Sequence, residues 1–384
     1  MTSLYPVPLD DAQSTIPSTW ALKYTDSVAH FAQQLWAVEL GIEGAPRPMR
    51  DPAVIDIGVE DEVRHLVRGF GRALRNQYKL SWSCKAYNAS VGGQDGDNPA
   101  LEKALSELYP GLDNVIESGP ASIVDKRGVL VLFLAEIFLS MSLINPTLQK
   151  AKNRPQTRGT WRQAVGNFEE GGFLEPGLAT LGIRQSQGHE KPKEEIHVTA
   201  DLGRSGSSPA AAQASARSWL DNSLVFGALM SAALAITHPE QYALARECLV
   251  RLSRECPTLE DILEIWPFAF NALAIVSNRA TPTHRDRNSG DVDDYDGMCT
   301  IGGDDRVVIE FPGLGLRARY QSGTMVWTSC YMHLHSVSES PDAERVAFAA
   351  YVKQSVHLET GLEAPRAPTL AVIQDSLVRQ MRSK

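Results

Sequence analysis

Three side chains in the last third of this 384-residue chain have the types and spacing of a metal site. His284 and Asp286 form a His-x-Asp pair, and His335 follows further along the chain. Two imidazoles and one carboxylate on one face of a metal ion form the facial triad of non-haem Fe(II) oxygenases, which leaves positions open for a co-substrate and O2. Alternate residues of an extended strand face the same side, so His284 and Asp286 can bind one ion. The pattern predicts an iron centre that activates O2.

Two further residues, His333 and Arg345, lie close to His335 in the sequence and refine the prediction. His333 and His335 face the same side of a strand, and the Ser336-Val337 that follows favours His335 as the ligand. His333 is then expected beside the substrate or O2 channel, or behind the ligands. Arg345 lies in RVAFAAYV, an otherwise apolar strand. Its planar guanidinium suits the far carboxylate of a 2-oxo acid bound to the iron. The alternative is a salt bridge from Arg345 to a nearby acid: Glu339, Asp342 or Glu344.

The chain around these residues is predicted to form short strands. From Ile265 onward, six β-rich runs are separated by Gly, Pro and Asp: FAFNALAIVSN, MCTIGG, RVVIEF, LRARYQ, TMVWTSCYMHLHSV and RVAFAAYV. Closely spaced strands without intervening helices indicate an antiparallel sandwich or barrel. Upstream, residues 221–254 predict two helices that support it, the first apolar nearly all round and therefore buried. The expected fold class is α+β.

Composition and charge restrict the possible functions. A chain with 43% hydrophobic and 22% charged residues is an ordinary globular protein. Five scattered cysteines without a CxxC pair argue against a zinc module or a disulfide scaffold. The longest apolar run, from Val129 to Ile144, is interrupted by Glu136 and predicts a buried helix rather than a membrane span. A net charge of −9 argues against indiscriminate coating of nucleic acid but permits a local basic groove.

Two upstream segments concentrate positive charge. Arg64, Arg68 and Arg72 recur at helical spacing on one face of a helix predicted from Glu60 to Leu80. The second segment is basic and carries an aromatic residue: Lys150, Lys152, Arg158 and Trp161. Cations beside an aromatic ring suit phosphate binding and base stacking. The alternatives are a solvated helix face paired with acids, and an exposed helix end with an incidental Trp.

Several motifs in the C-terminal half resemble one known family. THRDRN, YDGM, GLGLRARYQSGTMVW, LHSVSES and ERVAFAAYV are similar to the TET/J-binding-protein family of Fe(II)/2-oxoglutarate dioxygenases. Together with the upstream GALMSAALAITHPEQYALARECLVRL, they resemble its basidiomycete fungal branch over roughly residues 220–355. The resemblance implies a double-stranded β-helix (jelly roll) core flanked by helices, with Fe(II), 2-oxoglutarate and O2 as cofactor and co-substrates.

The resemblance also implies a substrate. The family oxidises the methyl group of 5-methylcytosine, or of thymine in the J-binding branch, and some fungal members are associated with N6-methyladenine. The expected reaction is hydroxylation of a methyl group on a base flipped out of double-stranded DNA. Carried over, His284, Asp286 and His335 resemble the iron ligands and Arg345 the co-substrate anchor. More loosely, Asn271 lies where related oxygenases contact the co-substrate.

One loop departs from the family pattern. After the His-x-Asp pair, the chain contains Asp291, Asp293, Asp294 and Asp296. Such a loop repels phosphate but can accept hydrogen bonds from an exocyclic amine, so Asp291, Asp293 and Asp294 are predicted to form part of a base-reading wall. The alternative is a solvated turn.

The expected organisation has four parts. Residues 1–20 form a flexible N-terminus, 21–183 a mainly helical part packed on the core, 184–216 a flexible low-complexity insert, and 217–384 supporting helices plus the dioxygenase core. We expect a monomer that contacts no membrane, with a nuclear location following from the substrate class. Two other functions remain open: an Fe(II)/2-oxoglutarate oxygenase acting on a small molecule, RNA or a protein side chain, and a non-catalytic cupin-like module whose His and Asp are structural.

Overall fold

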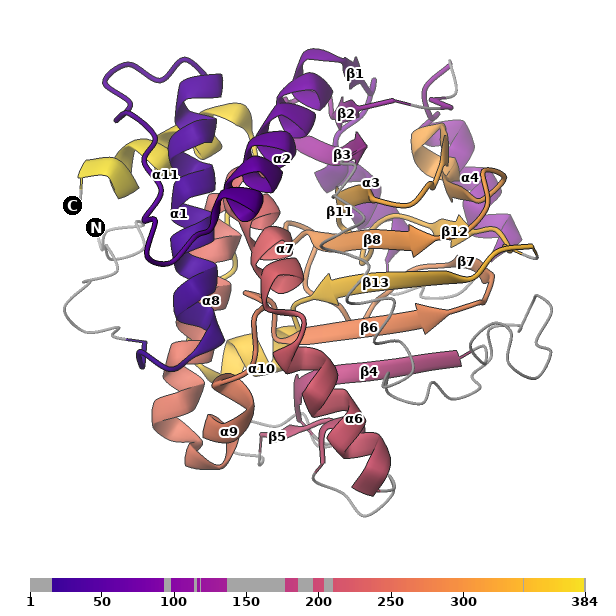
Figure 1. Cartoon of the computed structure of the whole chain (residues 1–384). Coiled ribbons are helices and arrows are strands. Elements are labelled where there is room, and N and C mark those ends of the chain that lie inside the picture. The colour runs from indigo at the N-terminus through magenta and orange to yellow at the C-terminus, as the bar shows by residue number, and fades with distance from the viewer. Residues whose placement is uncertain are drawn as a thin grey trace.

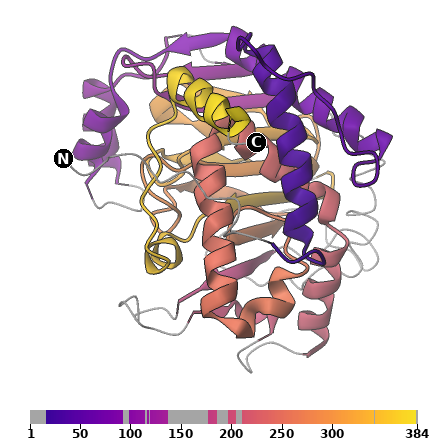
Figure 2. The same ribbon diagram turned by 90° about the vertical axis from the view of Figure 1, so that its left-hand side faces the viewer.

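The fold combines two β-sheets with a layer of helices, and is therefore α+β as expected. The computed structural model describes residues 16–92, 98–113, 116–117, 119–136, 177–185, 196–203, 210–340 and 342–382. In that part of the chain, one sheet has nine strands and the other has four. Figures 1 and 2 show the long helices gathered over one face of the large sheet.

The strands fall into an N-terminal and a C-terminal group. The first group is β1 (Gln77–Lys79), β2 (Ala121–Val124), β3 (Leu130–Glu136), β4 (Gly177–Arg184) and β5 (His197–Val198). The second is β6 (Ala272–Ser277), β7 (Thr281–His284), β8 (Asp296–Gly302), β9 (Val308–Phe311), β10 (Leu316–Arg319), β11 (Thr324–Thr328), β12 (His335–Val337) and β13 (Arg345–Tyr351). Each of the six β-rich runs predicted from sequence contains at least one strand of the second group.

The helices precede, separate and follow these strand groups. They are α1 (Ala21–Glu39), α2 (Ile57–Arg75), α3 (Cys84–Val91), α4 (Pro99–Leu108), α6 (Ala210–Asp221), α7 (Leu224–Thr237), α8 (Pro239–Glu255), α9 (Glu260–Leu263), α10 (Gln354–Glu359) and α11 (Leu370–Arg382). Short 3-10 turns are η2 (Ala200–Leu202), η3 (Pro257–Leu259) and η4 (Pro312–Leu314). None of the helices in the described part of the chain combines the length and apolar character that a membrane crossing requires.

Consecutive C-terminal strands are distributed between the two sheets. The large sheet has the order β1-β2-β3-β11-β8-β13-β6-β4-β5, and the small sheet has the order β10-β9-β12-β7. Strands β6, β8, β11 and β13 therefore form the centre of the large sheet, and β7, β9, β10 and β12 form the whole small sheet. The N-terminal strands extend both edges of the large sheet, so the part expected to be mainly helical also supplies β1 to β4.

The large sheet separates two apolar cores. One core fills the space between the sheet and the helices, where Phe70 of α2 packs edge-on against Phe133 of β3 with ring centroids 5.7 Å apart. The other lies between the two sheets and contains Phe311 of β9 and Val326 of β11. In β13, Val346, Phe348 and Ala350 join the helix-side core. Because alternate residues of a strand face opposite sides, Arg345 faces the space between the sheets.

The apolar run from Val129 to Ile144 was predicted to be a buried helix, and this prediction is wrong for its described part. Residues 130–136 form β3, which pairs antiparallel with both β2 and β11. Phe133 and Leu134 point to opposite faces, and both are fully buried because helices cover one face and the small-sheet side covers the other. A strand covered on both faces is apolar throughout, so hydrophobic periodicity does not distinguish it from a buried helix.

The segment expected to be a flexible insert, 184–216, is described only in part. It contains β5, the turn η2 and the beginning of α6. Backbone pairing of Ile183 with Val198 attaches β5 to β4 at the edge of the large sheet. On its other side β4 pairs antiparallel with β6.

Candidate metal centre

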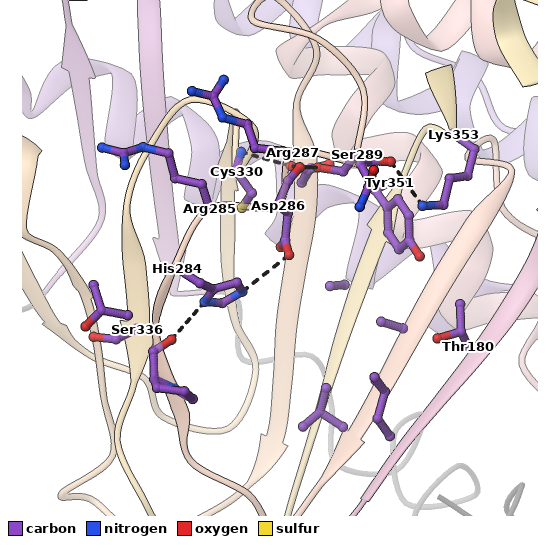
Figure 3. A pocket seen from close by; sticks show the side chains of 18 residues that line it. Thr180, His284, Arg285, Asp286, Arg287, Ser289, Cys330, Ser336, Tyr351 and Lys353 are labelled. Carbon is purple, nitrogen blue, oxygen red and sulfur yellow. Dashed lines mark hydrogen bonds and ion pairs between the residues drawn. The ribbon is translucent and has the colours of Figure 1, made fainter. Parts of the chain in front are cut away.

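Two strands of the small sheet bring the three predicted ligands together. His284 ends β7 and His335 begins β12, and the two residues lie directly opposite each other in the antiparallel ladder. Their ring centroids are 4.3 Å apart. The carboxylate of Asp286 lies 3.3 Å from Nε2 of His284 through Oδ1 (Figure 3). Its Oδ2 lies 3.6 Å from Nε2 of His335. One ligand atom from each residue lies within 4.8 Å of the others, as binding of one ion requires.

Backbone carbonyls fix the tautomer of both histidines. Nδ1 of His284 lies 2.8 Å from the carbonyl oxygen of Pro282, and Nδ1 of His335 lies 3.1 Å from that of His333. A carbonyl oxygen only accepts, so each Nδ1 carries a proton, and Nε2 is the nitrogen that has the lone pair when the ring is neutral. Histidines that ligate metals are commonly oriented in this way, by a hydrogen bond from the other ring nitrogen. The donor set therefore fits a divalent transition metal.

Two of the three converging residues, His284 and Asp286, line a pocket, whereas His335 is buried beside them and does not line it. The histidines are buried, whereas the side chain of Asp286 is 41% exposed. The pocket has a volume of about 860 Å³ and, besides the ligands' own loop, is lined by residues of β4, β6 and β13. Figure 3 shows His284 and Asp286 on one side of it, with Tyr351 and Thr180 on the other. Because Leu178, Ala274 and Ala349 also line it, the space beside the ligands has apolar surface as well as polar groups.

Arg285, between the two ligands His284 and Asp286, forms a buried ion pair behind the site. Its side chain is 0% exposed, and its Nη1 and Nη2 donate to the two carboxylate oxygens of Glu102 at 2.6 and 2.9 Å. Nη2 also donates to the Tyr87 hydroxyl, and Nε donates to the carbonyl oxygen of Met332. The pair thus joins α3 and α4 to the strand that carries His284 and to the segment before His335. No sequence pattern indicated this pairing, because Glu102 is remote in the chain.

His333 is not one of the converging ligands. It is 1% exposed and stacks on Tyr87 with centroids 5.7 Å apart. Burial lowers its pKa to about 3, with further lowering from Arg285 and His335, so the ring is neutral. Neither ring nitrogen has a hydrogen-bond partner among the described residues. His333 therefore lies behind the ligands, one of the two places expected for it, and does not line the pocket.

Arg345 lies between the sheets, on the face of β13 that also carries Ala349 and Tyr351. It is 2% exposed, its Nε donates to Oγ1 of Thr300 at 3.0 Å, and its guanidinium lies 5.1 Å from the centre of the Tyr320 ring. Burial lowers the pKa of Arg345 from its ordinary value. Within the described part of the chain no carboxylate pairs with it: the alternative partner Asp342 pairs with Arg306 instead. Arg345 is not among the residues lining the pocket.

Asn271, expected loosely at the co-substrate, instead joins two backbone segments. Its Oδ1 accepts from the backbone N–H of Lys353 at 2.6 Å, and its Nδ2 donates to the Lys353 carbonyl oxygen at 3.4 Å. The residue is 2% exposed and does not line the pocket. Its amide therefore ties the start of β6 to the end of β13 and is not directed at the site.

The acidic loop is a hydrogen-bonded turn rather than an open wall. Oδ2 of Asp291 accepts from Gln354, and Oδ2 of Asp294 accepts from the backbone N–H of Asp291. Burial raises the pKa of Asp294 to about 7 and that of Asp293 above its ordinary value. Asp291, Asp293 and Asp294 do not line the pocket, whereas Asp296, the last aspartate of the same loop, does.

Of the two basic segments predicted to contact DNA, the structure describes only the one on α2. Helix α2 packs on α7 and β3, on the face of the large sheet opposite to the metal ligands. Arg64 pairs with Glu60 on the same helix, and Arg68 and Arg72 are exposed. A strand bound along α2 would therefore be separated from the ligands by the sheet. The other predicted contacts lie outside the described residues: Lys150, Lys152, Arg158 and Trp161.

Comparison with known proteins found a weak similarity, to a solved structure. No protein-family model and no curated protein matches the chain. Among solved structures, NgTET1 in complex with 5mC DNA is similar at a TM-score of 0.38 and 11% identity, over 64% of this chain and 81% of that chain. The interpretation of the site therefore rests on its own geometry.

Proposed function

We propose that this chain is an Fe(II)/2-oxoglutarate-dependent dioxygenase. The observation that carries the proposal is the convergence of His284, Asp286 and His335, with both Nε2 atoms directed at the Asp286 carboxylate and both Nδ1 atoms donating to carbonyl groups. Two imidazoles and one carboxylate are the protein ligands of the non-haem iron oxygenases. Bound there with a 2-oxo acid and O2, ferrous iron supplies an oxidant strong enough to hydroxylate a methyl group.

The strand arrangement supports the same proposal. Eight consecutive strands, β6 to β13, form the centre of one sheet and the whole of another. We propose that they constitute the double-stranded β-helix implied by the sequence motifs, since a jelly roll is an eight-stranded double sheet. Its backbone ladder holds His284 and His335 opposite each other.

Arg345 is the proposed anchor of the co-substrate. A guanidinium buried without an anionic partner is costly, and the far carboxylate of 2-oxoglutarate would supply that anion. Thr300 and Tyr320 hold the guanidinium in place through the Nε hydrogen bond and the ring contact. The proposal requires the co-substrate to extend from the ligands toward the start of β13.

For the substrate we propose the methyl group of a flipped-out DNA base, 5-methylcytosine with N6-methyladenine as a further candidate. The sequence motifs support this choice, and a pocket of about 860 Å³ falls within the size range of small-ligand sites. Because the partly exposed Asp286 lines the pocket, a metal ion bound to it would lie beside the space that the base would occupy. A nuclear location would follow from such a substrate.

Metal binding tests the enzyme proposal directly. Anaerobic protein mixed with Fe(II) and 2-oxoglutarate should show a visible metal-to-ligand charge-transfer band, and His284→Ala and Asp286→Ala should lose both the band and bound iron. His333→Phe is the matched control: it keeps a ring on Tyr87 and removes two nitrogens that lack partners in the described structure. If the two ligand variants retain iron as well as His333→Phe does, the residues are structural and the proposal fails.

Nucleoside analysis tests the substrate. The protein is incubated with duplexes carrying 5-methylcytosine or N6-methyladenine, Fe(II), 2-oxoglutarate and O2, and the digested nucleosides are measured by mass spectrometry. Oxidised or demethylated nucleosides should appear only with the wild-type ligands. Succinate formation without any change in the bases would instead favour a small molecule, RNA or a protein side chain as the substrate.

A further inference from the structure

A second pocket lies next to the metal pocket. It has a volume of about 770 Å³ and shares part of its wall with the first: Thr180, Arg287, Asn288, Tyr351 and Lys353. Its remaining wall comes from the end of β4, the 287–290 loop and α10. A ligand bound beside His284 and Asp286 therefore has the second pocket as its neighbour.

The second pocket is cationic although the whole chain is acidic. Among the described residues, its charged lining consists of Arg184, Arg287 and Lys353 and one carboxylate, Glu359, whose Oε2 accepts from Gln185. The chain as a whole has a net charge of −9. An excess of positive charge confined to the far end of a pocket favours a ligand with an anionic group at that end.

Two of the cations lie on aromatic rings. Nζ of Lys353 lies 5.3 Å from the centre of the Tyr351 ring and donates to the Asn288 carbonyl oxygen at 3.1 Å (Figure 3). The guanidinium of Arg287 lies 4.5 Å from the centre of the Tyr331 ring. Cations combined with aromatic rings are the usual means of holding the backbone and bases of single-stranded nucleic acid.

The third cation has an unused donor. Nε of Arg184, at the end of β4, is buried and has no hydrogen-bond partner among the described residues. A buried donor left unpaired costs free energy, and a bound oxyanion would recover it. The strand β4 also supplies Leu178 and Thr180 to the metal pocket, so Arg184 is joined rigidly to the wall beside the ligands.

We propose that the second pocket binds a phosphodiester of the DNA strand whose flipped base occupies the metal pocket. Lys353 and Arg184 are the principal contacts, and Tyr351 lines both pockets. The guanidinium of Arg287 is directed away from Lys353, toward Tyr331 and the Gly92 carbonyl oxygen, and contributes charge only (Figure 3). This proposal rests on the proposed function, because it assumes that the substrate in the metal pocket is a flipped-out DNA base. It replaces α2 as the phosphate-binding surface, since α2 lies on the opposite face of the large sheet.

Oligonucleotide binding tests the assignment without requiring turnover. The full chain with Fe(II) is titrated anaerobically against a fluorescent single-stranded deoxyoligonucleotide containing one 5-methylcytosine, and anisotropy is recorded over a range of salt concentrations. Lys353→Gln and Arg184→Gln should each weaken binding roughly tenfold, the equivalent of one charge-assisted hydrogen bond. The slope of log affinity against log salt should fall by about 0.7 for each phosphate that the variant no longer neutralises. Lys353→Arg, which keeps the charge, should restore both.

The matched controls are Arg68→Gln and Arg72→Gln on α2, which should leave affinity and slope unchanged. Equal losses in these variants, or none in Lys353→Gln and Arg184→Gln, would overturn the proposal. So would tighter binding of the RNA strand of the same sequence, or a raised 2-oxoglutarate requirement with unchanged oligonucleotide affinity. The charge-transfer band of the wild-type protein separates the two proposals: without the band the enzyme proposal fails, whereas a band with insensitive oligonucleotide binding removes only the phosphate site.

Discussion

Truncation of Glu102 should destabilise the protein and weaken its metal site together. In Glu102→Ala, the fully buried guanidinium of Arg285 loses both carboxylate acceptors and keeps only Tyr87 and the Met332 carbonyl. Breaking a buried ion pair by removing one partner costs roughly 3–5 kcal/mol. The side chain of Glu102 is 19% exposed, so water can reach the vacated position and we expect about 3 kcal/mol.

Urea unfolding followed by tryptophan fluorescence measures this loss. Glu102→Ala should lower the unfolding midpoint with little change in slope, and Glu102→Gln, which retains one acceptor of the same shape, should lie between Glu102→Ala and the wild type. Glu107→Ala is the control, because Glu107 is exposed on the same helix, α4.

A second measurement separates positioning from stability. Arg285 lies between His284 and Asp286 in sequence and holds the Met332 carbonyl three residues before His335. Without urea, where the variant remains folded, Glu102→Ala should therefore bind Fe(II) more weakly than the wild type, and Glu107→Ala should not. If Glu102→Ala has the same unfolding midpoint and the same iron affinity as the wild type, the buried ion pair does not support the strands that carry His284 and His335.

Three further predictions address other parts of the structure. Arg345→Ala should raise the 2-oxoglutarate concentration needed for the charge-transfer band at least tenfold while leaving iron content unchanged, and an unchanged requirement would exclude Arg345 as the anchor. Burial raises the pKa of Asp294 from 3.8 to about 7, so its contribution to stability is fully present below pH 3.8 and is lost as pH rises to about 7. The free energy of unfolding of Asp294→Asn, measured at successive pH values, should not show this decline. If it falls with pH in parallel with that of the wild type, the prediction is wrong. A Cβ at Gly297 would clash with the Trp327 ring, so Gly297→Ala should cost about 1–3 kcal/mol in urea unfolding, and a neutral effect would show that the ring can move.

The ligand set was within reach of sequence because its members obey local rules. The His-x-Asp spacing keeps the two side chains close together, although β7 ends at His284 and Asp286 lies in the loop that follows it. The β-rich runs marked every strand of the second group except β7. The preference for His335 over His333 agrees with the geometry, in which His335 contributes the converging nitrogen. These inferences need only a few neighbouring residues.

The parts that sequence did not predict depend on contacts between distant segments. The pairing of Arg285 with Glu102 and the position of β4 beside the metal pocket join residues far apart in the chain. The basic stripe on α2 is real, but periodicity does not tell which side of a sheet a helix covers. The composition of the acidic loop suggested carboxylates available to a base, whereas they are engaged by Gln354 and by the loop's own backbone.

The ladder position of His335 has a consequence for how such a chain can change over time. His335 faces His284 across β12 and β7, and the pairing shifts register before Val337. Insertion or loss of one residue within β12 would turn the imidazole to the other side of the sheet. Loops around the pockets can therefore change in length and sequence during evolution without moving His284 and His335 apart. The condition is that the residue register between β7 and β12 stays the same.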